Sequence, residues 1–136
     1  MKLTIVGGGS TYTPEIVDGL VRMRDLLDVT ELALHDVSDE RLAVLAGMSR
    51  RMLTAGDHPA TVTTHTDLAA AADGAEVVLV QLRVGGQAAR LQDETLPLRC
   101  DCLGQETTGA GGLAKALRTV PAVSYTHLTL PTKRIV

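Results

Sequence analysis

The sequence predicts an α/β fold in which helices cover both faces of a parallel β-sheet. Short aliphatic runs typical of buried strands alternate along the chain with longer segments typical of helices. Strands are expected at residues 2–6, 31–36, 61–64 and 76–82. Aromatic residues make up only 1% of the 136 residues, so the core must be built from Leu, Val, Ala and Met. This composition suits a helix-covered parallel sheet, whose strands favour branched aliphatic side chains.

Helix start and stop signals follow the first two strands. Thr13 is a plausible N-cap, Pro14 fits the first helical position, and Glu15 complements the positive helix end. Ser38 is expected to cap the next helix, which stops before Gly56. The core-facing side of that helix is expected to comprise Leu42, Leu45, Met48 and Met52. Shorter helices are expected at 68–72, 87–92 and 113–118.

The first strand runs directly into Gly7, Gly8 and Gly9, and the next helix follows this loop. Gly7 allows the tight turn and Gly9 allows a pyrophosphate to approach the backbone, while the helix start favours the anion. Asp36 ends the second strand, where an acid accepts hydrogen bonds from a ribose hydroxyl and favours NAD over NADP. These features predict a Rossmann-like dinucleotide-binding unit. Tyr12 replaces the usual third glycine, so a structural turn, or a site for another anion, stays an alternative.

Charge and hydropathy exclude several classes of partner. The net charge of −3 gives no general attraction to nucleic acid or to acidic lipid. No apolar run approaches the ~18 residues of a membrane span. We therefore expect a cytoplasmic protein with neither a nucleic-acid nor a membrane partner. Cys100 and Cys102 are too close in sequence to staple a fold, and we expect two semi-buried thiols, with a metal pair as the alternative.

Three further motifs accompany the glycine loop. They are RVGG at 83–86, the acid pair at 93–94 with Pro-Leu at 97–98, and GQETTG at 104–109. Together with GGGSTYTPE at 7–15, this set resembles the family 4 glycoside hydrolases over residues 1–122. Within that family it is most similar to the 6-phospho-β-glucosidases.

The resemblance implies hydrolysis of O-glycosidic bonds in 6-phosphorylated β-glucosides, with NAD and a divalent metal, usually manganese, as cofactors. Family 4 enzymes depart from the usual two-carboxylate mechanism. NAD takes a hydride from the third carbon of the sugar, and a tyrosine base, assisted by the metal, removes the proton on the second carbon. The aglycone then leaves, water adds and the hydride returns, so NAD is recycled.

The resemblance also assigns roles to individual residues. Gly7, Gly8, Gly9 and Ser10 match the pyrophosphate loop, and Asp36 matches the ribose-binding acid. Arg83 matches an arginine that borders the nicotinamide and the substrate. Arg90 matches the arginine that holds the 6-phosphate of the substrate, and Glu106 matches an acid that raises the basicity of the tyrosine base.

Structural roles stay open beside these functional ones. Arg90 could be a solvated helix residue, and Glu106 could cap a loop through nearby N–H groups. The remaining polar residues of these motifs have expected structural roles: Gln81, Gln105 and Thr107 in ordering the loop, and Asp93 and Glu94 in an ion pair with Arg99.

The resemblance places the metal ligands and the tyrosine base of the family beyond this chain. We therefore expect residues 1–122 to be an incomplete, truncated NAD-binding domain that holds no metal ligands and is inactive alone. The full-length enzyme is expected to be a homo-oligomer. Residues 123–136 resemble a translated sequencing adapter and are expected to be a non-native tail, so Tyr125 and His127 are not candidate catalytic residues. A plain NAD-dependent dehydrogenase and a non-catalytic nucleotide-binding fragment are the alternatives.

Overall fold

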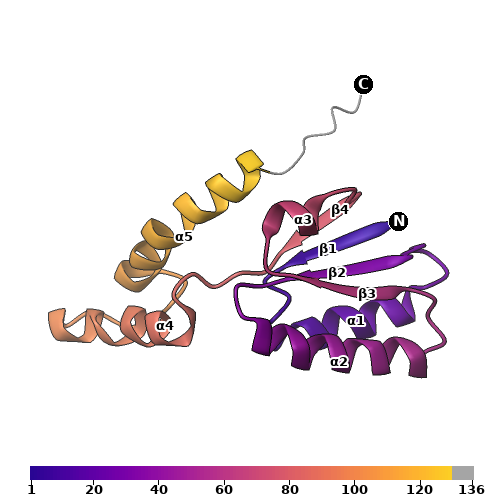
Figure 1. Ribbon diagram of the computed structural model, residues 1–136. Helices are drawn as coiled ribbons and strands as arrows, with labels where there is room; N and C mark the ends of the chain where they lie inside the picture. Colours follow the sequence, from indigo (N-terminus) through magenta and orange to yellow (C-terminus); the bar gives the residue numbers. More distant parts are fainter. Residues whose placement is uncertain (130–136) are drawn as a thin grey trace. The chain divides into compact units, whose positions relative to one another are not determined.

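The computed structural model describes the backbone of residues 1–129 and the side chains through Ser124. The described chain forms two compact units. The first unit, Met1–Leu82, contains a parallel four-stranded sheet in the order β3-β2-β1-β4. Its strands are β1 (Lys2–Val6), β2 (Glu31–His35), β3 (Thr61–His65) and β4 (Val77–Val80). Its helices are α1 (Thr13–Arg22), α2 (Asp39–Ala55) and α3 (Leu68–Ala72). Helices α1 and α2 cover one face of the sheet and α3 covers the other, so the predicted fold class is confirmed (Figure 1).

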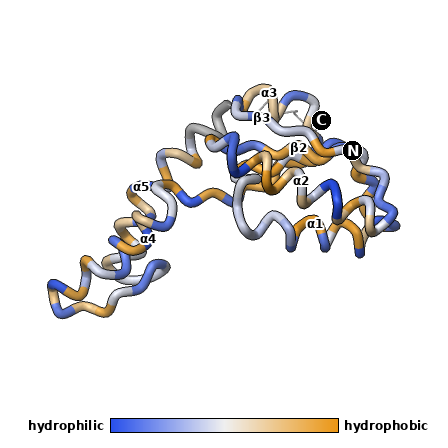
Figure 2. Tube along the Cα trace, turned by 60° about the horizontal axis from the view of Figure 1, so that its bottom comes forward, coloured by the Kyte–Doolittle hydropathy of each residue, from blue (hydrophilic) through white to orange (hydrophobic). Residues whose placement is uncertain are grey.

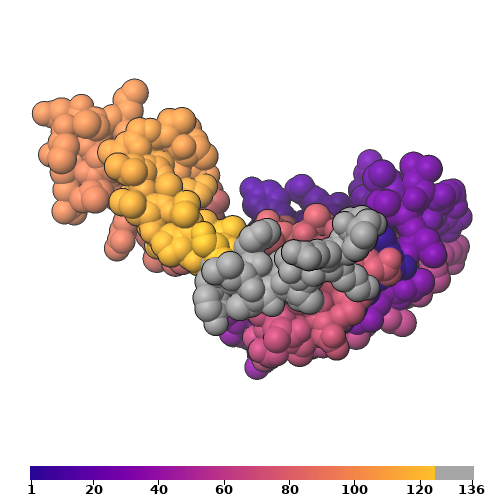
Figure 3. Space-filling model, turned by 90° about the horizontal axis from the view of Figure 1, so that it is seen from above, coloured from indigo at the N-terminus to yellow at the C-terminus, as the bar shows by residue number. Residues whose placement is uncertain are grey.

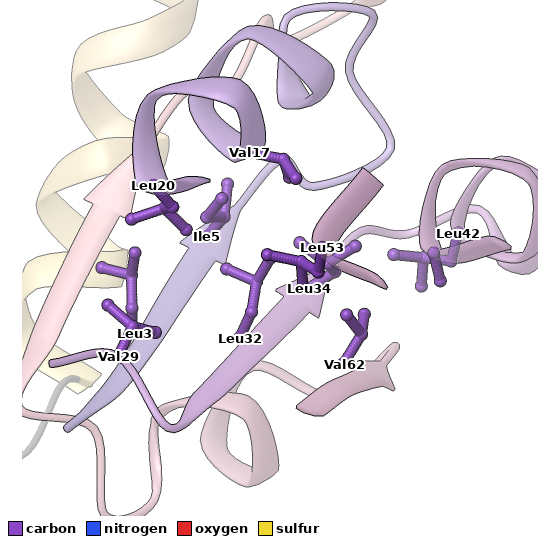
Figure 4. Packing of buried hydrophobic residues seen from close by; sticks show 11 residues of the cluster. Leu3, Ile5, Val17, Leu20, Val29, Leu32, Leu34, Leu42, Leu53 and Val62 are labelled. Atoms are coloured by element: carbon purple, nitrogen blue, oxygen red, sulfur yellow. The ribbon is translucent and has the colours of Figure 1, made fainter. Parts of the chain in front are cut away.

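The core lies between the sheet and helices α1 and α2. Because side chains alternate along a strand, Leu3 and Ile5 of β1 point to the same face as Leu32 and Leu34 of β2, their register partners. All four are fully or almost fully buried. Figure 4 shows them packed with Val17 and Leu20 of α1 and with Leu42 and Leu53 of α2. In Figure 2, β2 is largely orange, whereas α1 alternates between orange and blue, as expected for a strand buried on both faces and an amphipathic helix.

The core-facing side of α2 differs from the one expected from the sequence. Its buried residues are Leu42, Ala46, Ser49 and Leu53. The expected set was wrong in Met48, which is 39% exposed, although Met52 packs at the margin of the core. The buried positions advance by 3.6 residues per turn, and the small side chains of Ala46 and Ser49 fit where the helix approaches its neighbours closely. The buried Ser49 hydroxyl donates to Leu45 O at 2.7 Å.

The second unit begins at Arg83 and is helical as far as the structure describes it. It contains α4 (Gly86–Thr95), the 3-10 helix η1 (Pro97–Cys100) and α5 (Gly109–Thr129). Helices α4 and α5 are both longer than expected. In α5, Gly109–Gly112 form the first turn of the helix instead of a loop. Leu113, Leu117 and Val120 are exposed on α5, whose described side chains are orange to yellow in Figure 3.

Part of the predicted non-native tail, residues 123–136, lies outside the residues that the structure describes. The side chains of Tyr125 and His127 and all of residues 130–136 lie outside the described residues. Among the helices that are described, none combines the length and the apolar character needed to cross a membrane.

Candidate functional site

The glycine loop between β1 and α1 packs tightly against the two strands beside β1. Gly7 has a φ of +91°, and a Cβ atom there would lie 2.4 Å from Gln81 O. A Cβ atom on Gly8 would lie 2.8 Å from the Cβ of Leu34. The backbone N–H groups of Gly7 and Gly8 both donate to His35 O, at 2.8 and 2.7 Å. The glycines are therefore required by the packing of the loop itself.

Asp36 ties this loop to the start of α2. Its Oδ2 accepts a hydrogen bond from the N–H of Gly9 at 3.1 Å, and its Oδ1 accepts one from the N–H of Ser38 at 3.1 Å. A Cβ atom on Gly9 would lie 2.7 Å from the same Oδ2, so Gly9 leaves room for this carboxylate. A carboxylate has about four acceptor positions, so two remain for ribose hydroxyl groups.

The start of α1 has a donor suited to an anion. Within the described part of the chain, the N–H of Thr11 makes no hydrogen bond, whereas the N–H of Tyr12 donates to Ser10 Oγ at 3.2 Å. The positive end of the helix dipole lies at the same place. The loop therefore fits a bound pyrophosphate, with Asp36 available for the ribose.

Thr13 plays a different part from the one expected. The N-cap of α1 is Tyr12, without a side-chain cap, so the expectation that Thr13 caps the helix was wrong. The buried Thr13 hydroxyl donates to Gly8 O at 2.9 Å and accepts from Gln81 Nε2 at 2.9 Å. Gln81 Nε2 also donates to Gly7 O at 3.3 Å, so Gln81 orders the loop as expected. The turn at Gly8 places a carbonyl within reach of the Thr13 hydroxyl. The spacing of residues in the sequence gives no sign of this contact.

A cluster of alternating charges lies within the second unit. Arg83 forms an ion pair with Glu106, and Arg90 Nε lies 3.4 Å from Glu106 Oε2 and 2.7 Å from Glu94 Oε1. The side chain of Glu106 is 19% exposed. The hydrogen bond from Arg83, reinforced by the charges of Arg83, Arg90 and Lys115, holds the pKa of Glu106 below its ordinary value. The structure thus brings together three residues that the resemblance singled out, with Glu106 ionised between two arginines.

Two glycines allow the segment before α5 to lie against α4. A Cβ atom on Gly104 would lie 1.8 Å from Glu94 O, and one on Gly111 would lie 2.3 Å from Asp93 O. Between them, Gln105 Oε1 accepts hydrogen bonds from Thr107 N at 3.1 Å and from Thr107 Oγ1 at 2.7 Å. The expected ordering role of Gln105 and Thr107 is therefore seen, and it places Glu106 beside α4.

A buried ion pair joins α4 to α5. Asp93, whose side chain is 4% exposed, accepts two hydrogen bonds from Arg118, at 3.1 and 2.6 Å. The expected ion pair with Arg99 was wrong, because Asp93 binds Arg118 and Glu94 binds Arg90. The hydrogen bond from Arg118 lowers the pKa of Asp93 below its ordinary value and raises the pKa of Arg118. Sequence reasoning missed Arg118, whose 25-residue separation from Asp93 leaves no local signal.

No metal site is formed by the side chains that the structure describes, where no three His, Cys, Asp or Glu residues gather. Cys100 and Cys102 are both exposed, so the expectation of semi-buried thiols was wrong. The described residues therefore do not fit a divalent metal as a complete ligand set.

Acidification is expected to loosen the second unit. Because the pKa of Asp93 is lowered by folding, its ionised form stabilises the unit above the ordinary carboxyl pKa of about 4, and this stabilisation is lost as the pH falls through the lowered value. Backbone amide NMR signals of α4 and α5, recorded between pH 6 and pH 2.5, should lose dispersion at the acid end. Asp93→Asn should weaken that pH dependence, whereas Asp101→Asn, the same change at an exposed position, should keep it. Equal pH profiles for the two variants would contradict the assignment.

The chain is similar in sequence and in fold to known proteins. The model of the "Family 4 glycosyl hydrolase" family matches residues 2–126. The "6-phospho-beta-glucosidase" of Escherichia coli is 41% identical over 125 residues, which are 90% of this chain and 28% of that protein. The chain thus spans less than a third of the length of that relative.

Two solved structures are also similar to the chain. One is the 6-phospho-beta glucosidase from Thermotoga maritima with manganese, NAD+ and glucose-6-phosphate, which has a TM-score of 0.89 and 33% identity, and matches 96% of this chain and 31% of its own. The other is a 6-phospho-alpha-glucosidase from gut microorganisms with NAD and Mn2+, with a TM-score of 0.89 and 31% identity over 95% of this chain and 30% of its own. On the extent of these matches, the chain belongs to family 4 of the glycosyl hydrolases.

Proposed function

We propose that this chain is the NAD-binding part of a longer enzyme that hydrolyses O-glycosidic bonds in 6-phosphorylated β-glucosides. The family and the printed names of the Escherichia coli and Thermotoga maritima relatives support this substrate class. Residues 1–122 would form the cofactor-binding domain. A homo-oligomeric full-length form and a cytoplasmic location remain predictions from the sequence.

The cofactor role rests on the glycine loop and Asp36. Bound NAD supplies a reversible hydride acceptor. In this proposal, Gly7, Gly8, Gly9 and Ser10 surround the pyrophosphate, and the N–H of Thr11 donates to it. Asp36 accepts from the ribose hydroxyl groups, and its charge repels the phosphate that distinguishes NADP from NAD.

The substrate role rests on the charged cluster of the second unit. A guanidinium group presents paired N–H donors that match phosphate oxygens. Arg90 would hold the 6-phosphate by exchanging Glu94 for the more highly charged phosphate, and Arg83 would border the reacting sugar and the nicotinamide. Glu106, kept ionised by the two arginines, would raise the basicity of a tyrosine supplied by the rest of the enzyme. The manganese ligands, which the family resemblance places outside this chain, would come from that same part.

The cluster of Arg83, Arg90 and Glu106 is the observation that favours a glycosidase over a plain NAD-dependent dehydrogenase. Both kinds of enzyme need the glycine loop and Asp36, but the hydride transfer of a dehydrogenase does not by itself call for a phosphate-binding arginine such as Arg90 or for an acid such as Glu106 held between two arginines. A dehydrogenase would accumulate NADH with its substrate, whereas the proposed enzyme returns the hydride. A non-catalytic nucleotide-binding fragment would bind NAD without either outcome.

Calorimetric titration of the folded chain with NAD and with NADP tests the cofactor role. We expect NAD to bind more tightly than NADP. Asp36→Asn should weaken NAD binding about 30-fold, because it removes a charged acceptor worth about 2 kcal/mol and disturbs the Gly9 and Ser38 hydrogen bonds. The matched control is Asp39→Asn, an equal change of charge at an exposed position in the first turn of α2. Absence of binding heat would refute the cofactor role, and equal effects of the two variants would refute the role of Asp36.

A further inference from the structure

We propose that Arg118 is a positioning residue of the charged cluster: through Asp93 and the carbonyl of Val84, it fixes the segment that carries Arg83 and Arg90 so that both reach Glu106. In the described structure, Arg118 forms no ion pair with Glu106 and pairs instead with Asp93. Its importance for catalysis rests on the function proposed above. The geometric claim concerns the second unit alone.

The guanidinium group of Arg118 binds the chain at two places, one just before α4 and one within it. Arg118 Nε donates to Val84 O at 2.8 Å, immediately after Arg83 and before the first turn of α4. Its two terminal nitrogens bind both carboxylate oxygens of Asp93, one helical turn beyond Arg90. One planar guanidinium group therefore joins Val84, which precedes α4, to Asp93, which follows Arg90 in the helix. Its rigid fork of N–H donors leaves the side chain little rotational freedom.

The surroundings of Arg118 restrict it to this arrangement. Gly85 has a φ of +82°, and a Cβ atom there would lie 2.6 Å from the Cβ of Ala89 and 3.3 Å from Arg118 Nε. Gly111 brings α5 against the backbone of Asp93, as described above. The Asp93 carboxylate is almost fully buried, so it needs a charged partner held in place.

The ionisation of Glu106 reports on this arrangement. The groups that lower its pKa are Arg83, Arg90 and Lys115, while Glu94 shares Arg90 with it. Among the described side chains, Arg118 forms no ion pair with Glu106. Because Arg118→Lys keeps the positive charge, a rise in the Glu106 pKa in that variant would mean that Arg83 or Arg90 had moved.

The test is a carboxyl NMR titration of Glu106 in the folded chain. In Arg118→Met, we expect the Glu106 pKa to rise toward its ordinary value of about 4.3. Arg118→Lys keeps the charge but cannot grip Val84 and both Asp93 oxygens together, so its value should fall between those of the parent and Arg118→Met.

Two controls separate position from charge and from stability. Arg99→Met removes the same charge from η1, away from the Asp93 pair, and should leave the Glu106 pKa unchanged. Lys115→Met should raise it slightly, by loss of a direct charge. A parent-like Glu106 pKa in folded Arg118→Met or Arg118→Lys would overturn the proposal. Loss of the α4 and α5 amide signals in both Arg118 variants would also overturn it, because it would indicate a purely structural pair. The titration needs neither NAD nor sugar, so a failed NAD titration leaves its result intact.

Discussion

Gly7→Ala is expected to lower the free energy of unfolding of the first unit by about 3 kcal/mol, from the combined cost of left-handed strain and overpacking. Gly7 has a φ of +91°, which a residue with a side chain adopts only with strain. The added Cβ would also lie 2.4 Å from the backbone oxygen of Gln81, the residue after β4. The hydrogen bond from the Gly7 N–H to His35 O, at 2.8 Å, holds this part of the loop in place. Urea unfolding, followed by amide signals of β1 and β2, measures the effect.

Gly74→Ala is the matched control for this substitution. Gly74 also has a positive φ, of +67°, but no atom lies within 4 Å of the position its Cβ would take. Only the backbone strain then applies, so we expect a loss of about 1 kcal/mol. Equal losses at the two positions would mean that the contact with Gln81 does not restrict the loop.

Thr13→Val is expected to destabilise the first unit by about 3 kcal/mol, since it leaves buried polar groups without their partner. Valine has nearly the shape of threonine, so packing is kept while the hydroxyl is lost. Gly8 O loses its donor, and Gln81 Nε2 loses the acceptor at 2.9 Å. Because both partners hold the glycine loop, NAD affinity should fall in the same variant.

Thr11→Val makes the same chemical change two residues earlier, where the side chain is exposed. Such a surface substitution should change the free energy of unfolding by no more than about 0.5 kcal/mol. Urea titrations of the two variants side by side separate the buried hydroxyl from any general effect of valine at a helix start. If Thr11→Val cost as much as Thr13→Val, the hydrogen bonds of Thr13 would not be the cause.

Features that depend on neighbouring residues could be predicted from the sequence. The strand at Lys2–Val6 and the helix at Leu68–Ala72 have the expected bounds, and Ser38 caps α2 by accepting from the N–H of Arg41 at 3.3 Å. Caps and strand alternation are local, because the interacting groups are within a few residues of each other. The position of Asp36 beside the glycine loop could also be predicted, since adjacent parallel strands end at the same edge of a sheet.

The face of α2 and the hydroxyl of Thr13 could not be predicted in the same way. Met48 is as apolar as the residues that are buried, yet the close approach of α2 to the core selects the smaller Ala46 and Ser49. Thr13 has an ordinary capping sequence, but the turn at Gly8 brings a carbonyl within its reach. Both outcomes depend on the shape of the packed structure.

The sequence by itself determined the parallel α/β fold, the glycine loop and, through its motifs, the family. Only the tertiary structure decided which charges pair: Glu106 with Arg83 and Arg90, and Asp93 with Arg118 instead of Arg99. The physical reason is distance along the chain. An ion pair depends on separation in space, and these partners, 16 to 25 residues apart, meet only because Gly104 and Gly111 let the second half of the unit lie against α4.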